Sequence, residues 1–453
     1  MYYIPIDMVR KSKPQLPSGF KDYLPKEELR RNEMLDIIKK NFELFGFVPL
    51  DTPAIEEEKT LTGGDAEFKK QIFRIKKSDE SEDLALRFDL TVPLARVISL
   101  YPNEVTFPFK RYQMGKVWRG EKPQAGRFRE FLQFDADIVG SGSILADAEI
   151  VALMSQVMLS LGFQNFLIKV NNRKIFSGLP RYAGFSKEKL NAVLRAVDKL
   201  DKIGRSGVVK ELSAKDGADL GKDESEKVMN FFSLRAKNNR ELLTLAAGEF
   251  SDAGAAEGLK EMESLADHLA ALEIPEDKWT FDFSTVRGLS YYTGFVFETV
   301  LTDLPEVGSV FSGGRYDDLV ARLGGAELPA VGVSVGVDRM LYAMEKLGIF
   351  SDGAKSAKVI VLNFEEPAVS RTETVVSALR KNGIPSEIYL GKEKTLKGQL
   401  SYALKNDYGV AILIGEREMS RGTATVKDFK SYRQTEVKME DVVSEIKKII
   451  GGE

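Results

Sequence analysis

The stretch between residues 107 and 139 says most about the fold, and it reads FPFKRYQMGKVWRGEKPQAGRFREFLQFDADIV. Its first part is rich in aromatic and β-branched residues, which favour strands. A charged loop containing Gly and Pro follows at 120–126, and a second apolar run covers Phe128–Val139. These features predict a strand–loop–strand hairpin whose loop is unusually long and charged.

The second strand of this hairpin carries a row of polar side chains. Phe131, Gln133, Asp135 and Asp137 are each two residues apart, so they share one face of a strand. Buried carboxylates without partners are costly, and the row therefore indicates a polar ligand. The alternative is an edge hairpin whose salt bridges lie on a solvated face.

Arginines flank the loop of the hairpin. Arg119 follows the first strand, and Arg127 and Arg129 begin the second. Because Arg binds phosphate oxygens in a bidentate manner, cations on both sides of a loop indicate a clamp for a polyphosphate.

The overall composition is that of a globular protein. The chain has 453 residues, about three times the length of a typical domain, which predicts two or three domains. Lys and Arg number 65 against 68 Asp and Glu, and the net charge of −3 excludes a uniformly basic nucleic-acid coat but allows a local basic face. No stretch has the pattern of a signal peptide or a membrane span, so we expect a cytoplasmic protein.

Two residue types that often carry catalysis are absent or rare. The chain has no Cys, which excludes disulfides, thiolate metal sites and Cys nucleophiles. Its single His, His268, excludes a multi-His metal site within one chain, and we expect it at the surface of a helix. The remaining chemistry depends on carboxylates, Arg, Lys, Tyr and backbone groups.

Outside the hairpin, the hydrophobic pattern changes along the chain. Residues 26–45 predict an amphipathic helix, and residues 186–272 predict a helical insertion. Residues 331–337 read VGVSVGV, a strand with one apolar face and one nearly bare face against which a ligand can lie. A short polar linker at 349–356 precedes alternating strands and helices, which predict a small α/β domain with a mainly parallel sheet.

Three further clusters are candidates for binding. Asp89 and Thr91 would point to the same side of an extended segment and could hold an ammonium group; a solvent-facing strand end is the alternative. Residues 286–292 (VRGLSYY) combine an Arg, a Gly and two neighbouring Tyr that would point to opposite sides. Residues 313–317 (GGRYD), followed by a Gly-rich strand and Arg339, suggest a nucleotide-binding site. The usual Gly-rich sequence motifs for phosphate binding are absent.

These motifs, taken in order, resemble those of the histidyl-tRNA synthetases, a family of class II aminoacyl-tRNA synthetases. Residues 46–53 (GFVPLDTP) resemble class motif 1, whose proline, Pro53 here, belongs to a dimer interface. The hairpin from 109 to 137 resembles motif 2, and residues 332–339 resemble motif 3. More specific are residues 287–292 and 313–317, which resemble the signature of this one family.

The resemblance implies an α+β fold: an antiparallel-sheet catalytic core with a helical insertion, followed by a small α/β domain. Residues 1–348 would form the catalytic domain, with the insertion at about 172–276 touching the acceptor stem of tRNA. The linker would occupy 349–356, and residues 357–453 would form the anticodon-binding domain. A basic face of that domain would contain Lys392, Lys394, Lys397 and Lys405.

The implied enzyme is a homodimeric ligase that needs ATP and Mg²⁺. It would join L-histidine and ATP into histidyl-adenylate and pyrophosphate, and then transfer histidine to the 3′-terminal adenosine of tRNA(His). In-line attack on phosphorus needs alignment and a cation at the developing charge more than a general base. The scarcity of His and Cys is therefore no obstacle to this chemistry.

The resemblance also implies roles at the ATP site. Arg119 would grip both the ATP α-phosphate and the histidine carboxylate. Glu121 and Arg127 would hold the adenine edge and the γ-phosphate. Phe131 and Arg339 would cover the two faces of adenine.

A second set of roles is implied for the histidine site. Asp89, Thr91 and Gln133 would bind the α-ammonium group. Asp137 and Tyr292 would read the imidazole, with Tyr291 beside them. Arg287 would be the catalytic cation at the α-phosphate, and no side chain is assigned as a metal ligand.

The chain departs from the family at a few positions, and rivals remain. Ser290 stands where the family usually has Asp, and Asp89 and Asp137 replace Glu of many bacterial relatives, as in the eukaryotic-type branch. The main rival is the synthetase-like regulatory subunit of ATP phosphoribosyltransferase, but that protein lacks the anticodon domain and usually the Arg at 287. Two weaker rivals are a synthetase of another class II specificity and an ATP-binding module with an RNA-binding tail.

Overall fold

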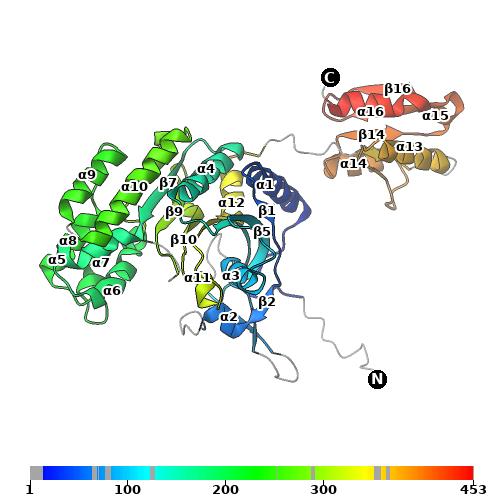
Figure 1. Ribbon diagram of the computed structural model, residues 1–453. Coiled ribbons are helices and arrows are strands. Elements are labelled where there is room, and N and C mark those ends of the chain that lie inside the picture. Colours follow the sequence, from blue (N-terminus) through cyan, green and yellow to red (C-terminus); the bar gives the residue numbers. More distant parts are fainter. Residues whose placement is uncertain are drawn as a thin grey trace, which may run out of the picture. The chain divides into compact units, whose positions relative to one another are not determined.

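The computed structural model describes residues 14–63, 69, 71–76, 83–122, 128–250, 252–286, 291–350, 359–363 and 368–451. The chain divides into two compact units, Met1–Ile349 and Phe350–Glu453, which are both drawn in Figure 1. Within the described part of the chain, no helix has the length and apolar character needed to span a membrane.

The first unit is built around an eight-stranded sheet (Figure 1). The strands at each edge pair in parallel, and all the pairs between them are antiparallel. This arrangement confirms the predicted antiparallel core, and the hairpin supplies two adjacent strands of it. In order across the sheet, the strands are β1 (Val48–Pro49), β5 (Phe109–Trp118), β6 (Glu130–Val139), β11 (Ala330–Gly336), β10 (Ser309–Arg315), β9 (Phe295–Leu301), β7 (Phe166–Asn172) and β8 (Trp279–Phe281).

The two faces of β6 have different neighbours. Phe134 packs against Phe42 of the first helix with ring centroids 4.9 Å apart, so even-numbered residues face that helix. Odd-numbered residues point the other way, where Val139 joins a cluster with Leu94 and Ile98. Helices pack on both faces of the sheet. The face that carries Phe134 has α1 (Pro25–Leu44), α4 (Ile144–Ser160) and α12 (Val337–Lys346), and the face that carries Val139 has α3 (Thr91–Leu100) and α11 (Leu319–Arg322).

A small antiparallel sheet lies in the same unit, with strand order β2-β4-β3. Its elements are β2 (Ile55–Glu57), α2 (Glu58–Thr62), β3 (Phe73–Ile75) and β4 (Leu84–Leu86).

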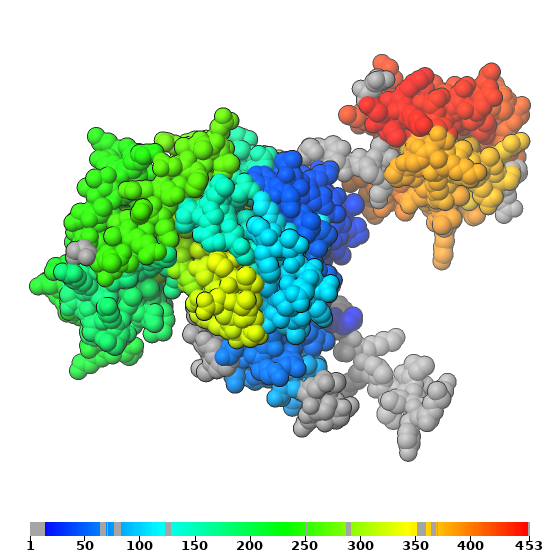
Figure 2. Space-filling view, viewed as in Figure 1, coloured from blue at the N-terminus to red at the C-terminus, as the bar shows by residue number. Residues whose placement is uncertain are grey.

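Helices fill the chain between β7 and β8, and they form the green lobe in Figure 2. Aromatic rings contribute to its core: Phe231 stacks on Phe283 at 5.1 Å and also contacts Phe232 and Phe250. His268 lies in the last turn of the longest of these helices and is partly exposed. The elements are η3 (Arg173–Gly178), α5 (Leu179–Ala183), η4 (Lys187–Lys189), α6 (Leu190–Val197), α7 (Leu200–Ser213), α8 (Lys222–Phe232), α9 (Asn239–Glu249), α10 (Ala253–Ala271) and η5 (Glu276–Lys278); η6 (Pro305–Val307) follows β9.

The second unit contains a five-stranded sheet with strand order β13-β12-β14-β15-β16. Its apolar core includes Val361, Leu379, Ile412 and Ile446. The elements are β12 (Val359–Val361), α13 (Val369–Lys381), β13 (Ser386–Ile388), α14 (Leu396–Lys405), β14 (Val410–Leu413), α15 (Glu416–Arg421), β15 (Thr423–Asp428), β16 (Gln434–Lys438), η8 (Met439–Asp441) and α16 (Val442–Gly451).

The prediction of a mainly parallel sheet in this unit is wrong. Among the described strands, only the two pairs made by β12 are parallel, whereas β14, β15 and β16 pair antiparallel. Part of the reason is β16, a polar and mostly exposed strand that the hydrophobic pattern did not reveal, although β15 also pairs antiparallel with β14. It follows β15 after a short turn, and a short turn joins antiparallel strands.

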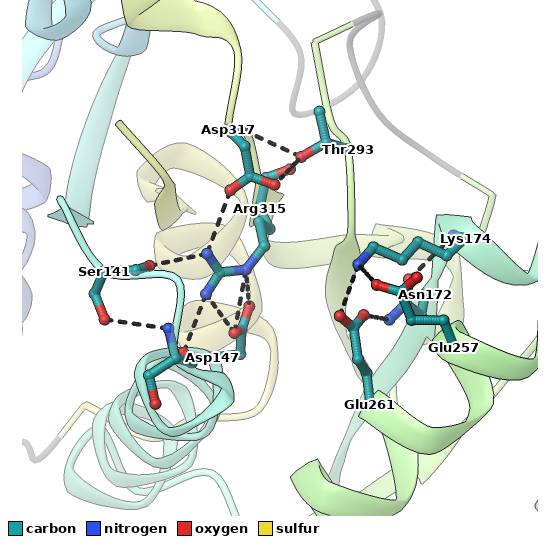
Figure 3. Close-up of polar contacts among 10 residues, drawn as sticks. Ser141, Asp147, Asn172, Lys174, Glu257, Glu261, Thr293, Arg315 and Asp317 are labelled. Atoms are coloured by element: carbon teal, nitrogen blue, oxygen red, sulfur yellow. Dashed lines mark hydrogen bonds and ion pairs between the residues drawn. The ribbon is translucent and has the colours of Figure 1, made fainter. Parts of the chain in front are cut away.

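One buried ion pair links the sheet of the first unit to α4. The Arg315 guanidinium bonds to both oxygens of Asp147, with Nε 3.0 Å from Oδ1, and also donates to the Ser141 carbonyl at 2.9 Å (Figure 3). Asp147 has no exposed surface. Removing one partner of a buried pair leaves an uncompensated charge inside the protein.

We therefore expect Asp147→Ala to lower the free energy of unfolding by about 3 kcal/mol, since Asp317 still pairs with Arg315 at 3.3 Å. Urea unfolding followed by tryptophan fluorescence measures this, since both Trp residues lie in the first unit. The control is Asp318→Ala, which breaks an exposed ion pair with Arg322 and should change stability by less than about 1 kcal/mol. Equal effects of the two substitutions would contradict this account of the buried pair.

Candidate active site

The polar row on β6 lies in the interior of the first unit. Gln133, Asp135 and Asp137 are 8%, 2% and 2% exposed, so the alternative of a solvated edge hairpin is wrong. The register places them directly beside the nearly bare strand β11: Gln133 opposite Gly336, Asp135 opposite Ser334 and Asp137 opposite Gly332.

Glycine on β11 is required by this close approach. A Cβ atom at Gly332 would lie 1.8 Å from Oδ1 of Asp137. A Cβ atom at Gly313 of β10 would in turn lie 2.0 Å from the Gly332 carbonyl oxygen. The bare face of the strand therefore makes room for the Asp137 carboxylate.

Several buried polar atoms in this region have no hydrogen-bond partner among the described residues. They include Oδ1 of Asp135, Oε1 of Gln133, Oδ2 of Asp89 and Oδ2 of Asp137. Burial raises the pKa of Asp135 to about 7, while Arg111 acts to lower it. Unsatisfied buried groups are rare in folded proteins, and a cluster of them points to a polar ligand.

Asp89 and Thr91 are close to this row, but not on an extended segment as expected. Thr91 is the first residue of α3, and Oδ1 of Asp89 accepts a hydrogen bond from the Val92 N–H at 3.0 Å. Pro93 is compatible with this helix because a proline in the first turn removes no helical hydrogen bond. Asp89 is 2% exposed, so the solvent-facing alternative is wrong as well.

Burial also changes the acidity of Asp89. It raises the pKa of this carboxyl to about 6, against the lowering effects of the Val92 N–H and of Arg119. A buried carboxylate with one free oxygen and a cation nearby is suited to an ammonium group, which would compensate its charge.

Arg119 stands between this buried region and an open pocket. Its Nε donates to the Phe88 carbonyl at 3.1 Å, and its guanidinium carbon lies 5.1 Å from the centre of the Phe131 ring. The pocket is lined by Arg119, Glu121, Phe131, Gln133 and Arg339, among others. Four of the five residues predicted for ATP thus share one pocket, and the fifth, Arg127, lies outside the described residues.

Arg339 is held at the start of α12. Its Nη1 donates to the Ser309 carbonyl at 2.7 Å, on the strand next to β11. Ser309 and Arg339 both line the pocket, as does Phe131. This placement would allow a planar ring of a ligand to lie between the Phe131 ring and the Arg339 guanidinium group.

The two neighbouring tyrosines do not point to opposite sides. The rings of Tyr291 and Tyr292 contact each other with centroids 4.9 Å apart, and Tyr291 also contacts Tyr316 at 5.9 Å. Burial raises the pKa of both tyrosines, and the charge of Asp137 adds to the effect on Tyr292. They are therefore neutral hydrogen-bonding groups near Asp137. Arg287 and Ser290, which precede them, lie outside the described residues.

Two residues at Asp137 were not assigned a role from the sequence. Arg111 forms an ion pair with Asp137 at 2.8 Å and has no exposed surface, and the Tyr316 hydroxyl donates to Asp137 at 2.5 Å. The signal for Arg111 lies in the hairpin register, which places it directly opposite Asp137. Tyr316 belongs to the GGRYD cluster, but its partner is distant in sequence.

The sheet and its pocket define the catalytic core of a class II aminoacyl-tRNA synthetase. A family model for histidyl-tRNA synthetase matches residues 19–340, and a model for an anticodon binding domain matches residues 357–449. The chain belongs to the histidyl-tRNA synthetase family.

Individual relatives agree with this assignment. The histidine–tRNA ligase of Clostridium tetani is 39% identical over 442 residues, which cover 96% of this chain and 98% of the relative. The crystal structure of histidyl-tRNA synthetase from Nostoc sp. PCC 7120 superposes with a TM-score of 0.84 and 31% identity, covering 97% of this chain and all of that one. A protein from Bacillus halodurans described as an ATP phosphoribosyltransferase regulatory subunit/histidyl-tRNA synthetase shares the fold, with a TM-score of 0.73, 23% identity and coverage of 87% and 97%.

Proposed function

We propose that this chain is a histidine–tRNA ligase: it forms histidyl-adenylate and pyrophosphate from histidine and ATP, and then transfers histidine to the 3′-terminal adenosine of tRNA(His). The observation that carries the proposal is the position of Arg119. It connects a buried polar region containing unpaired carboxylates to a pocket lined by an aromatic ring and a second arginine.

In the first step, an oxygen of the histidine carboxylate attacks the α-phosphorus of ATP and pyrophosphate leaves. Arg119 can contact both the carboxylate and the α-phosphate because it lies between their sites. It thereby orients the two reactants and stabilises the charge that develops on phosphorus. Arg287 is proposed as a second cation at the same phosphate.

The ATP base is proposed to lie between Phe131 and Arg339, with its edge near Glu121. Arg127 is proposed to hold the γ-phosphate. Mg²⁺ is proposed to accompany the ATP phosphates, where it neutralises part of their charge. Among the described residues, no group of three acidic or histidine side chains is placed to hold a metal ion.

Histidine itself is proposed to bind in the buried region. Its ammonium group would pair with Asp89 and contact Thr91 and Gln133. Its imidazole would lie near Asp137, Tyr291 and Tyr292. A pocket that hydrogen-bonds ring N–H groups strongly rejects amino acids that lack them.

Further proposals concern the whole chain. The catalytic domain is proposed to span residues 1–348 and the anticodon-binding domain 357–453, with the insertion at about 172–276 on the acceptor stem. Lys392, Lys394, Lys397 and Lys405 are exposed and are proposed to contact tRNA. We also propose a cytoplasmic homodimer: near Pro53, Val48 and Ile55 are 48% and 45% exposed, as expected of an apolar contact surface.

The regulatory alternative is not favoured. The second unit matches an anticodon-binding model over residues 357–449, and full-length relatives are histidine–tRNA ligases. Pyrophosphate exchange into ATP, measured with each of the twenty amino acids, tests the proposal. We expect exchange with histidine alone, whereas exchange with none would return the regulatory subunit to consideration.

A further inference from the structure

One oxygen of the Asp137 carboxylate accepts a hydrogen bond, and the other lies in an ion pair. The Tyr316 hydroxyl donates to Oδ1 at 2.5 Å, and Nη2 of Arg111 lies 2.8 Å from Oδ2. All three side chains are buried, and Arg111 has no exposed surface at all. Removing an arginine so completely from water costs free energy, and its position beside a single carboxylate therefore needs an explanation.

Arg111 joins the two halves of the proposed histidine site. Its Nη2 also donates to the Leu90 carbonyl at 3.1 Å, between Asp89 and Thr91. Asp137 lies opposite Arg111 on one side and opposite Gly332 on the other, so three adjacent strands meet at this point. Arg111 contacts Asp137 and the Leu90 carbonyl but does not line the ATP pocket. A change at Arg111 should therefore affect the binding of histidine more than the binding of ATP.

Tyr316 is fixed through its neighbours in the chain. Arg315 is anchored to Asp147, and Oδ2 of Asp317 accepts from the Thr293 hydroxyl at 2.6 Å (Figure 3). The Tyr316 N–H donates to the Ala330 carbonyl at 2.7 Å. The backbone is held on both sides of Tyr316, and its side chain is buried with the hydroxyl on Asp137.

We propose that Arg111 and Tyr316 are positioning residues for substrate selection, which keep the Asp137 carboxylate ionised and oriented as a hydrogen-bond acceptor for an imidazole N–H. This inference rests on the proposed function. Each carboxylate oxygen has two lone pairs, so both can accept a further hydrogen bond while they are held.

The charge of Asp137 depends on Arg111. Burial raises the pKa of Asp137, whereas Arg111 and the Tyr316 hydroxyl act to lower it. Other groups facing the carboxylate are Tyr292 and Asp135. Without the arginine, the protonated acid would be neutral and one of its oxygens would become a donor, so it would accept a hydrogen bond from a ring N–H more weakly than the carboxylate does.

The first test is Tyr316→Phe, which removes one hydroxyl and keeps the ring. In pyrophosphate exchange we expect the KM for histidine to rise about tenfold, since a hydrogen bond to a charged group is lost. The KM for ATP should stay within about twofold. Preference for histidine over 2-thiazolylalanine, whose ring has no N–H, should shrink by a similar factor.

The matched control is Tyr112→Phe on the strand that carries Arg111. It also removes a hydroxyl that donates to a carboxylate, Glu43 at 2.9 Å, but it lies on the opposite face of β5. Normal exchange by wild type combined with unchanged histidine KM in Tyr316→Phe would overturn the inference and leave the proposed function intact. An equal rise in both KM values would overturn it too, because it would indicate a general structural role.

The second test is Arg111→Met, read as a pH profile. Loss of the cation lets burial raise the pKa of Asp137 and of its neighbour Asp135 further, so the rise in histidine KM should be largest at neutral pH and diminish as the pH increases. A histidine KM that is raised equally at every pH would contradict the inference. If Tyr316→Phe fails to fold, the pH profile of Arg111→Met tests the inference by itself.

Discussion

Arg119→Ala is expected to lower the rate of histidine-dependent pyrophosphate exchange by about a thousandfold. Arg119 lies between the proposed histidine and ATP sites, and it is the described cation best placed to contact both reacting groups. Its loss removes orientation of the carboxylate together with stabilisation of the charge on phosphorus. The effect should appear mainly in kcat, because these interactions strengthen as the phosphorus is attacked.

The comparison for this substitution is Arg322→Ala. Arg322 belongs to the same unit but is exposed, and it pairs with Asp318, the residue that precedes α11. Exchange by this variant should remain within about twofold of wild type, since exposed ion pairs contribute little. A loss of less than tenfold in Arg119→Ala would show that Arg119 does not contact the reacting groups.

Local sequence patterns were sufficient to predict the parts of the site that lie on a single strand or hairpin. The period of two placed Gln133, Asp135 and Asp137 on one face of a strand, and they do share a buried face beside the bare strand β11. Aromatic and β-branched composition predicted the hairpin, and the small residues of 331–337 predicted a close approach. The roles given to these residues remain predictions.

Contacts between distant segments were beyond such patterns. Tyr316 and Asp137 are 179 residues apart, and Arg315 and Asp147 are 168 apart, so no sequence window contains either pair. Arg111 looked like an ordinary strand residue until the register placed it opposite Asp137. The helical start at Thr91 was missed because Thr-Val-Pro is typical of extended segments, while burial against the sheet favours a helix there.

Asp89→Asn is expected to weaken histidine binding and, at the same time, to stabilise the fold. Asparagine keeps the oxygen that accepts from the Val92 N–H, so the start of α3 should be preserved. It lacks the charge proposed to pair with the substrate ammonium group. Loss of a buried ion pair of this kind should raise the KM for histidine about a hundredfold.

The gain in stability follows from the raised pKa of Asp89. This carboxyl has a pKa of about 6 in the folded protein and 3.8 as an ordinary Asp, so between these values the folded state binds more protons than the unfolded state. Wild type therefore loses stability as the pH rises from about 4 to about 6, and the loss persists above that range. The variant has no such loss and should be more stable at pH 7 by about 2–3 kcal/mol.

Urea unfolding at pH 7 and at about pH 4.5 distinguishes this explanation from a general effect of asparagine, because the advantage of the variant should shrink to about 1 kcal/mol at the lower pH. Asp252→Asn is the matched control: Asp252 also accepts from backbone N–H groups at the start of a helix, α10, but its pKa is lowered by the Ser177 hydroxyl. That variant should lose stability rather than gain it.

An ionised Asp89 destabilises the wild type at neutral pH. A binding site for an ammonium group requires such a carboxylate, since the bound substrate supplies the positive charge that the fold does not provide.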